Sequence, residues 1–160
     1  MQIETERLLL RPFAEADAAD LYRYAKDPEV GPAAGWPPHG SVEESRNIIR
    51  LVLSGPESYA ICKKEDGRVI GAIALSLNGD SRLAEEEDEC ELGYWIGKPF
   101  WGQGLMTEAS EALLRRAFTE LGMRRVWCGY FEGNEKSKRV QEKLGFRHEK
   151  TLRDVDVPLL

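Results

Sequence analysis

Short apolar runs, rich in branched and aromatic residues, predict β-strands at intervals along the chain. Glu65-Asp66-Gly67 separates two of these runs, and an Asp-Gly pair in such a place predicts a tight β-hairpin. A weaker pattern over 146–155 predicts one more strand near the end. The clearer strand predictions cover 7–13, 59–63, 69–77, 92–96 and 125–131.

The first half also carries apolar residues at the spacing that places them on one face of a helix. One such helix is predicted over 17–25. A second follows Ser41, which with Glu44 three residues later has the spacing of a capping box. Prolines and glycines over 30–40 predict an irregular loop, in which Trp36 is a large aromatic residue.

Two more helices are predicted in the second half of the chain. One opens near Leu105, and a shorter one follows Gly133-Asn134 and stops at Gly145. This mixture of strands and helices predicts an α/β domain whose sheet is antiparallel early and contains parallel pairing later. With 160 residues, 42% of them hydrophobic, the chain suits a single domain over 1–160.

A glycine loop, Trp101-Gly102-Gln103-Gly104, joins the strand over 92–96 to the next helix. Its two glycines remove side chains that would keep a ligand from the main chain, and they permit a positive φ. The helix N-terminus behind them offers unpaired N–H groups and the positive end of the helix dipole. The stretch therefore predicts a cradle for a phosphorylated ligand, although an ordinary tight turn has the same pattern.

Charge and composition narrow the class of partner. The net charge of −6 and the pI near 5.1 disfavour a broad nucleic-acid surface. The sequence has neither a run of about 18 apolar residues nor a basic-then-apolar leader. We therefore expect no membrane association and a cytoplasmic location.

Cysteines and histidines suggest neither a disulfide framework nor a metal site. Cys62, Cys90 and Cys128 are widely spaced and lie in predicted strands, which indicates buried thiols in a reducing compartment. His39 and His148 are isolated from each other and from cysteine pairs. We expect no metal ion.

Five motifs occur in order along nearly the whole chain: Thr5-Glu-Arg-Leu-Leu-Leu-Arg-Pro-Phe13, Glu91-Leu-Gly-Tyr-Trp-Ile96, Trp101-Gly-Gln-Gly-Leu-Met-Thr-Glu-Ala109, Gly133-Asn-Glu-Lys-Ser137 and Glu142-Lys-Leu-Gly-Phe146. Together they resemble the GNAT N-acetyltransferases. They are most similar to the RimJ/RimL group, which acetylates protein N-termini and related amines.

The resemblance implies the GNAT, or acyl-CoA N-acyltransferase, fold. This is a mixed, mostly antiparallel sheet of about six to seven strands with a splayed central pair, flanked by four helices. The splay would separate the strand over 92–96, carrying a bulge, from the strand near Val126. Acetyl-CoA would be the co-substrate, and the acceptor would be an amine, for example the N-terminus of a protein.

The resemblance also implies roles for individual residues. Main-chain N–H groups of the glycine loop and the first helical turn would hold the pyrophosphate. Asn134 matches a coenzyme-contacting asparagine, and Ser137 matches a position that can protonate the departing thiolate. The implied coenzyme-binding residues are Tyr94, Trp95, Ile96, Gly102, Gln103, Gly104, Leu105, Met106, Thr107 and Asn134.

Two features depart from the family pattern. Pro99 occupies a position where the wider superfamily often has Gln or Arg, which removes one possible coenzyme contact. Family members usually continue after Phe146 into a last strand. Either 155–160 is all that remains of that strand or the sequence given is shortened.

Acetyl transfer by direct attack needs a neutral amine, a polarised carbonyl and a protonated leaving thiol. An α-amine has a pKa of about 7.7–8.0 and a lysine about 10.4, so a base helps the first and is close to necessary for the second. Glu91 is the candidate base and Ser137 the candidate acid. The main-chain N–H of Tyr94 or Trp95 is the candidate for polarising the carbonyl.

Plainer alternatives remain open at this point. Glu91 also fits a solvent-facing strand end, and Ser137 fits an exposed helix position. Trp36, the candidate substrate-binding residue, also fits a packing anchor. The acidic run over 85–89 either attracts a cationic acceptor or is a solvated loop.

Other functions are also compatible with parts of the pattern. A dinucleotide-binding fold would need a third glycine where Thr107 stands, and a P-loop would need Gly-Lys-Ser or Gly-Lys-Thr, which is lacking. An acyl-CoA-binding sensor would need neither Glu91 nor Ser137. For an enzyme, the sequence leaves open a peptide N-terminus, an aminoglycoside or a polyamine as acceptor, and a monomer or a homodimer.

Overall fold

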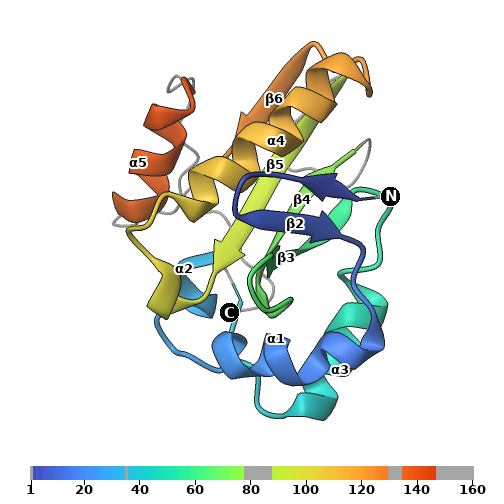
Figure 1. The fold of residues 1–160 in the computed structure, drawn as a ribbon, viewed down its shortest axis with the longest axis vertical. Coiled ribbons are helices and arrows are strands. Elements are labelled where there is room, and N and C mark those ends of the chain that lie inside the picture. Colours follow the sequence, from blue (N-terminus) through green and yellow to red (C-terminus); the bar gives the residue numbers. More distant parts are fainter. Residues whose placement is uncertain (1, 35, 78–87, 130–134, 147–160) are drawn as a thin grey trace, which may run out of the picture.

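One mixed sheet organises the molecule, with its strands side by side in chain order (Figure 1). The computed structural model describes residues 2–34, 36–77, 88–129 and 135–146. All neighbouring strands are antiparallel except β5 and β6, which are parallel. The six strands are β1 (Ile3–Glu4), β2 (Leu8–Arg11), β3 (Ser58–Lys63), β4 (Val69–Ser76), β5 (Glu89–Ile96) and β6 (Arg125–Cys128).

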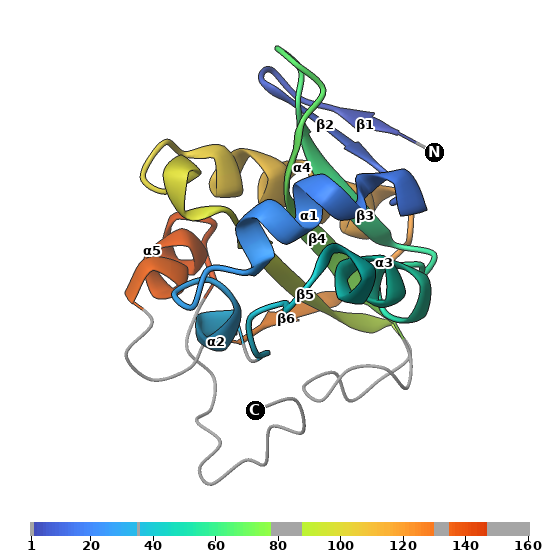
Figure 2. The same cartoon turned by 90° about the horizontal axis from the view of Figure 1, so that it is seen from below.

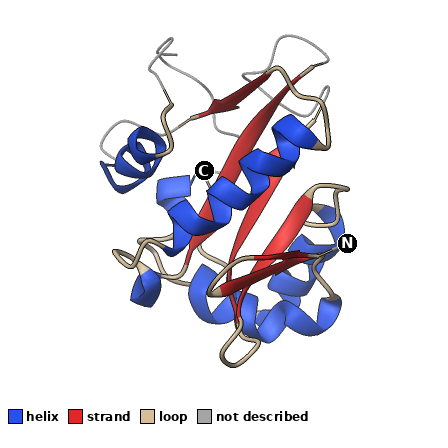
Figure 3. Ribbon diagram, turned by 45° about the horizontal axis from the view of Figure 1, so that its top comes forward, coloured by secondary structure: helices blue, strands red, loops and turns tan. Residues whose placement is uncertain are grey.

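Helices cover both faces of this sheet. Helix α4 crosses one face, and α1 and α3 lie on the other (Figures 2 and 3). The α-helices are α1 (Ala18–Ala25), α2 (Gly31–Ala34), α3 (Val42–Leu51), α4 (Leu105–Thr119) and α5 (Glu135–Lys143), and the 3₁₀ turns are η1 (Glu15–Asp17) and η2 (Lys98–Phe100). One mixed, mostly antiparallel sheet flanked by helices is the arrangement that the family resemblance implies.

The larger core lies between α4 and the sheet. Ala109, Leu113 and Ala117 of α4 are fully buried, as the predicted stripe requires. They belong to one cluster with alternate residues of the strands, among them Ile61 and Leu92. Because side chains alternate along a strand, the intervening residues face α1 and α3.

Sequence patterns over a few neighbouring residues predicted most of the helices, strands and turns correctly. The Asp66-Gly67 hairpin joins β3 to β4, with Gly67 at φ +73°. At the start of α3 the Ser41 hydroxyl accepts from the Glu44 N–H at 3.0 Å. The Glu44 carboxylate accepts from the Gly40 N–H at 2.9 Å, one residue earlier than in a standard capping box.

Two expectations were wrong. Helix α2 forms inside the predicted loop. Pro32 is compatible with it because this residue falls in the first turn, where a missing N–H loses no hydrogen bond within the helix. The expected bulge in β5 is absent from its pairing with β4, whose register runs evenly from Gly71–Ile96 to Ser76–Glu91. A register shift occurs instead between Ile61 and Cys62 of β3.

Within the described residues, β6 pairs with the first half of β5. The two strands pair from Glu89–Arg125 to Leu92–Cys128, and Cys128 is the last residue of β6. Strand β5 then continues to Ile96 beside β4 (Figure 3). The rest of the predicted 125–131 strand beyond residue 129, and the predicted 146–155 strand beyond residue 146, lie outside the described residues.

A buried ion pair ties α4 to the start of β3. Arg116 donates two hydrogen bonds of 2.8 Å to the Glu57 carboxylate, which also accepts from the Tyr59 hydroxyl at 2.7 Å. Glu57 is only 6% exposed. The Arg116 hydrogen bonds, opposed by burial and assisted by Tyr59, hold the pKa of Glu57 below its usual 4.5. Ionised Glu57 therefore stabilises the fold.

Glu57→Gln is expected to lower the free energy of unfolding at pH 7 by about 2 kcal/mol, because it weakens charge-assisted bonds. A lowered folded-state pKa contributes stability above the unfolded-state pKa and loses it as pH falls through the folded value. The difference between wild type and variant should therefore shrink below pH 4.5. Urea unfolding at several pH values from 7 to 3 measures this difference in unfolding free energy. Glu65→Gln, at an exposed position, is the control. A difference that does not change with pH would contradict the assignment.

Candidate active site

The glycine loop sits where β5 meets α4. Gly102 and Gly104 have φ of +77° and +76°, the left-handed region that glycine adopts without strain. Gly104 is the N-cap of α4 and provides no side-chain cap. Leu105 and Met106 have buried side chains, so only their main chain can contribute to a ligand site. The loop thus has the expected geometry for a cradle built on backbone groups.

An arginine of the N-terminal segment braces this loop, a contact that the sequence reasoning missed. The Arg7 guanidinium donates to the Gln103 carbonyl at 3.0 Å and to the Glu108 carboxylate at 2.7 Å. Glu108 also accepts from the Arg7 N–H at 2.8 Å and from the Thr5 hydroxyl at 2.5 Å. The first and third motifs contain these residues, but only the tertiary fold joins them.

Side-chain interactions also fix the approach to the loop from β5. The Trp101 indole N–H donates to the Ile96 carbonyl at 3.0 Å, and the Gln103 amide donates to the Pro99 carbonyl at 3.1 Å. Ile96 itself is buried and packs in the main core. The Ile96 side chain therefore stabilises the core, and the Gln103 side chain stabilises the glycine loop.

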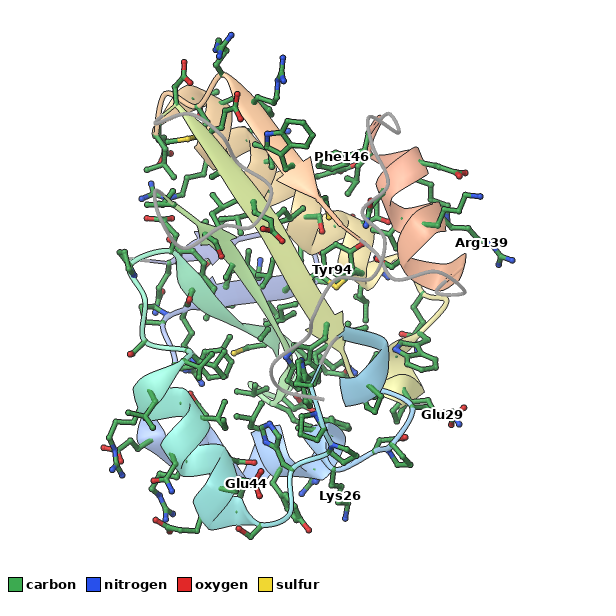
Figure 4. The ribbon with its side chains drawn as sticks, turned by 180° about the vertical axis from the view of Figure 1, so that it is seen from behind. Lys26, Glu29, Glu44, Tyr94, Arg139 and Phe146 are labelled. Atoms are coloured by element: carbon green, nitrogen blue, oxygen red, sulfur yellow. The ribbon has the colours of Figure 1, made fainter. Side chains whose placement is uncertain are left out.

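Tyr94 of β5, which is labelled in Figure 4, is in direct contact with Ser137 of α5. The two hydroxyl oxygens are 2.8 Å apart, and either can donate. The Gln141 amide donates to the Ser137 hydroxyl at 3.2 Å and to the Gly129 carbonyl at 3.0 Å. Burial, with a smaller contribution from Cys128, raises the pKa of Tyr94 to about 12. Tyr94 is therefore a protonated donor at neutral pH.

Cys128, the last residue of β6, lies close to Tyr94 and Glu91. Burial and the nearby Glu91 carboxylate raise the pKa of its thiol to about 12. A thiol that stays protonated is a poor nucleophile. The arrangement therefore favours direct attack by an amine over an acetyl-cysteine intermediate.

The opposite face of β5 borders a hollow. Glu91, Gly93 and Trp95 alternate with the core-facing residues and so point toward the α1 and α3 side. Trp36 packs edge-on against Trp95, with ring centroids 5.4 Å apart. The hollow has a volume of about 220 Å³ and is lined by Phe13, Trp36, Leu53, Ser58, Tyr59, Ala72, Ile73, Ala74, Gly93, Tyr94 and Trp95.

The predicted site residues thus gather around β5. Tyr94 and Ser137 meet on one face, while half-buried Glu91 shares the other with Trp36 and the hollow. Thr107 lies in the first turn of α4, next to the glycine loop. Asn134 lies outside the described residues.

The sequence model of the "Acetyltransferase (GNAT) domain" matches residues 7–147. The chain belongs to the GNAT acetyltransferase family. It therefore catalyses acetyl transfer to an amine, and the acetyl donor of this family is acetyl-CoA. In the part of the chain that is described, no helix has both the length and the apolar character needed to cross a bilayer.

Individual relatives agree with this assignment. The uncharacterized N-acetyltransferase p20 of Bacillus licheniformis is 31% identical over 95% of this acetyltransferase and 85% of its own length. The ribosomal protein uS5-alanine N-acetyltransferase of Escherichia coli is 35% identical over 41% of this chain and 34% of its own. The crystal structure of a GNAT-family acetyltransferase from Bacillus anthracis is 24% identical and matches the fold with a TM-score of 0.84, covering 99% of this chain and 92% of that one.

Proposed function

We propose that this acetyltransferase moves the acetyl group of acetyl-CoA to the N-terminal α-amine of a protein or peptide, by direct attack in a ternary complex. The observation that carries the proposal is the two-sided arrangement of β5. A carboxylate and an apolar hollow lie on one face, a pair of hydroxyls lies on the other, and uncapped helix amides lie beyond its end.

The donor side depends on the glycine loop. The N–H groups over 102–107 would bind the diphosphate of the coenzyme, with the α4 dipole adding to the attraction. The Arg7 guanidinium, held between the loop carbonyl of Gln103 and the Glu108 carboxylate, would keep the loop in shape for this binding, while its charge is balanced by Glu108. Asn134, as a family-matched position, stays a predicted coenzyme contact.

The chemistry then divides between the two faces. Glu91 would take the proton from the amine, directly or through water, as the N–C bond forms and the C–S bond breaks. The main-chain N–H of Tyr94 or Trp95 would polarise the carbonyl. The Ser137 hydroxyl, which contacts Tyr94 and accepts from Gln141, would give its proton to the leaving thiolate.

Two observations favour an α-amine as acceptor. The hollow is lined by no charged side chain among the described residues, which suits a polyamine or an aminoglycoside poorly because their several ammonium groups would lose hydration there. The name of the partial match in Escherichia coli describes acetylation of an alanine of a ribosomal protein. A protein N-terminus is the acceptor class that both support.

The hydroxyl pair gives a prediction about the leaving group. Ser137→Ala is expected to lower kcat about tenfold, because Tyr94 can partly replace the lost donor, and Tyr94→Phe to lower it by a similar factor. The double variant should lose more than either single variant. Stopped-flow measurement of thiol release separates this step from binding. Wild-type kcat in the double variant would remove both residues from the mechanism.

An acceptor screen tests the function as a whole. Purified enzyme and acetyl-CoA are mixed with peptides, polyamines or aminoglycosides, and free thiol release is followed, with mass spectrometry locating the acetyl group. Acetylation at a peptide N-terminus is expected. Turnover of only a small amine would overturn the choice of acceptor, and coenzyme binding without any turnover would favour an acyl-CoA sensor.

A further inference from the structure

The hollow beside β5 originates from a row of small residues across three strands. Ser58 of β3 pairs with Ala74 of β4, and Ala74 pairs with Gly93 of β5. A Cβ atom placed on Gly93 would meet no heavy atom of the described residues within 4 Å, apart from those of its two chain neighbours. Since residues in one row of a sheet face the same way, their missing side chains leave the floor of the hollow open.

The walls of the hollow are apolar. Trp36 and Trp95 form one aromatic corner, and Phe13 and Leu53 belong with them to the satellite core under α1 and α3. An apolar group entering this space would be removed from water on several sides. A charged group would lose hydration there, because the described residues of the lining offer it neither a carboxylate nor a cation.

The position of the hollow relative to Glu91 suggests which group enters. Glu91 and Gly93 are two residues apart on the same face of β5, a separation of roughly 7 Å between their Cα atoms. In an amino acid the α-amine and the side chain leave the same carbon atom. An α-amine held near Glu91 can therefore direct its own side chain over Gly93.

We propose that the hollow binds the side chain of the acceptor's first residue and selects an apolar one, such as leucine, methionine or phenylalanine. This inference rests on the proposed function, because it assumes a peptide α-amine. The volume of about 220 Å³ lies below the range of about 300–1,000 Å³ that is typical of whole-ligand pockets. It suits a single side chain, and Gly93 and Ala74 set its depth.

The test compares peptides that differ only in their first residue: glycine, leucine, phenylalanine, aspartate or lysine. For wild type, kcat/KM for the leucine peptide is expected to exceed that for the glycine peptide about tenfold and that for the aspartate peptide by more. Gly93→Val, which a strand tolerates well, should fill the hollow and reduce the leucine-to-glycine ratio about tenfold. Ala74→Val should act in the same direction.

Controls make the outcomes separable. Leu51→Ala, at a position of α3 that is 78% exposed, should leave the leucine-to-glycine ratio unchanged. Acetylation of every peptide without dependence on the first side chain would overturn this inference and leave the proposed function intact. No acetylation of any peptide would overturn the proposed function itself. If Gly93→Val instead altered the preference between acetyl-CoA and hexanoyl-CoA, the hollow would be a site for the acyl chain and the inference would be wrong.

Discussion

Gly104→Asp is expected to weaken acetyl-CoA binding on the order of a hundredfold. The new carboxylate would stand at the N-terminus of α4, where the proposed site holds the diphosphate. Two unit charges about 4 Å apart repel by roughly 4 kcal/mol near a protein surface, and a tenfold loss of affinity needs about 1.4 kcal/mol. Part of the repulsion is screened by solvent and salt. Isothermal titration calorimetry at low and high salt measures the loss.

A matched variant separates charge from backbone strain at the same position. Gly104→Asn has nearly the same shape as Gly104→Asp and tolerates the left-handed φ of +76°, but it adds no charge. It should lose much less affinity. Gly67→Asp repeats the charged substitution at another glycine of positive φ, in the β3–β4 hairpin. Native affinity in Gly104→Asp, or equal losses in the Asp and Asn variants, would exclude a diphosphate at this loop.

The second large effect is expected from Glu91→Gln. Removing a general base typically costs a factor of 10² to 10⁴, and we expect about a hundredfold loss of kcat/KM at pH 6.5. An α-amine with a pKa of about 7.7–8.0 is mostly protonated at that pH, and the variant must wait for its spontaneous deprotonation. Above pH 9 the amine is mostly neutral, so the difference between wild type and variant should become smaller.

The pH profile of kcat/KM, measured with one peptide from pH 6 to pH 9.5, checks this expectation. Glu111→Gln is the control, because it makes the same change of charge at an exposed position of α4. Its profile should follow that of wild type. If Glu91→Gln kept wild-type activity at pH 6.5, another group or the solvent would have to accept the proton.

Local sequence signals were sufficient for most elements of the fold. The Asp66-Gly67 hairpin, the Ser41 cap and the buried stripe of α4 each depend on residues within a few positions of one another. Hydrophobic period and turn chemistry record such short-range requirements directly. The glycine loop belongs to the same class, since positive φ at Gly102 and Gly104 is a property of single residues.

Tertiary structure decided which distant residues meet around β5. Glu108 receives Arg7 from 101 positions away, and Tyr94 reaches Ser137 43 positions further along the chain. The row from Ser58 through Ala74 to Gly93 exists only because three strands pair in one register. Periodicity within a segment shows which face is buried but not what lies opposite. Strand register and helix docking, which arise from packing of the whole chain, determine the shape of the candidate site.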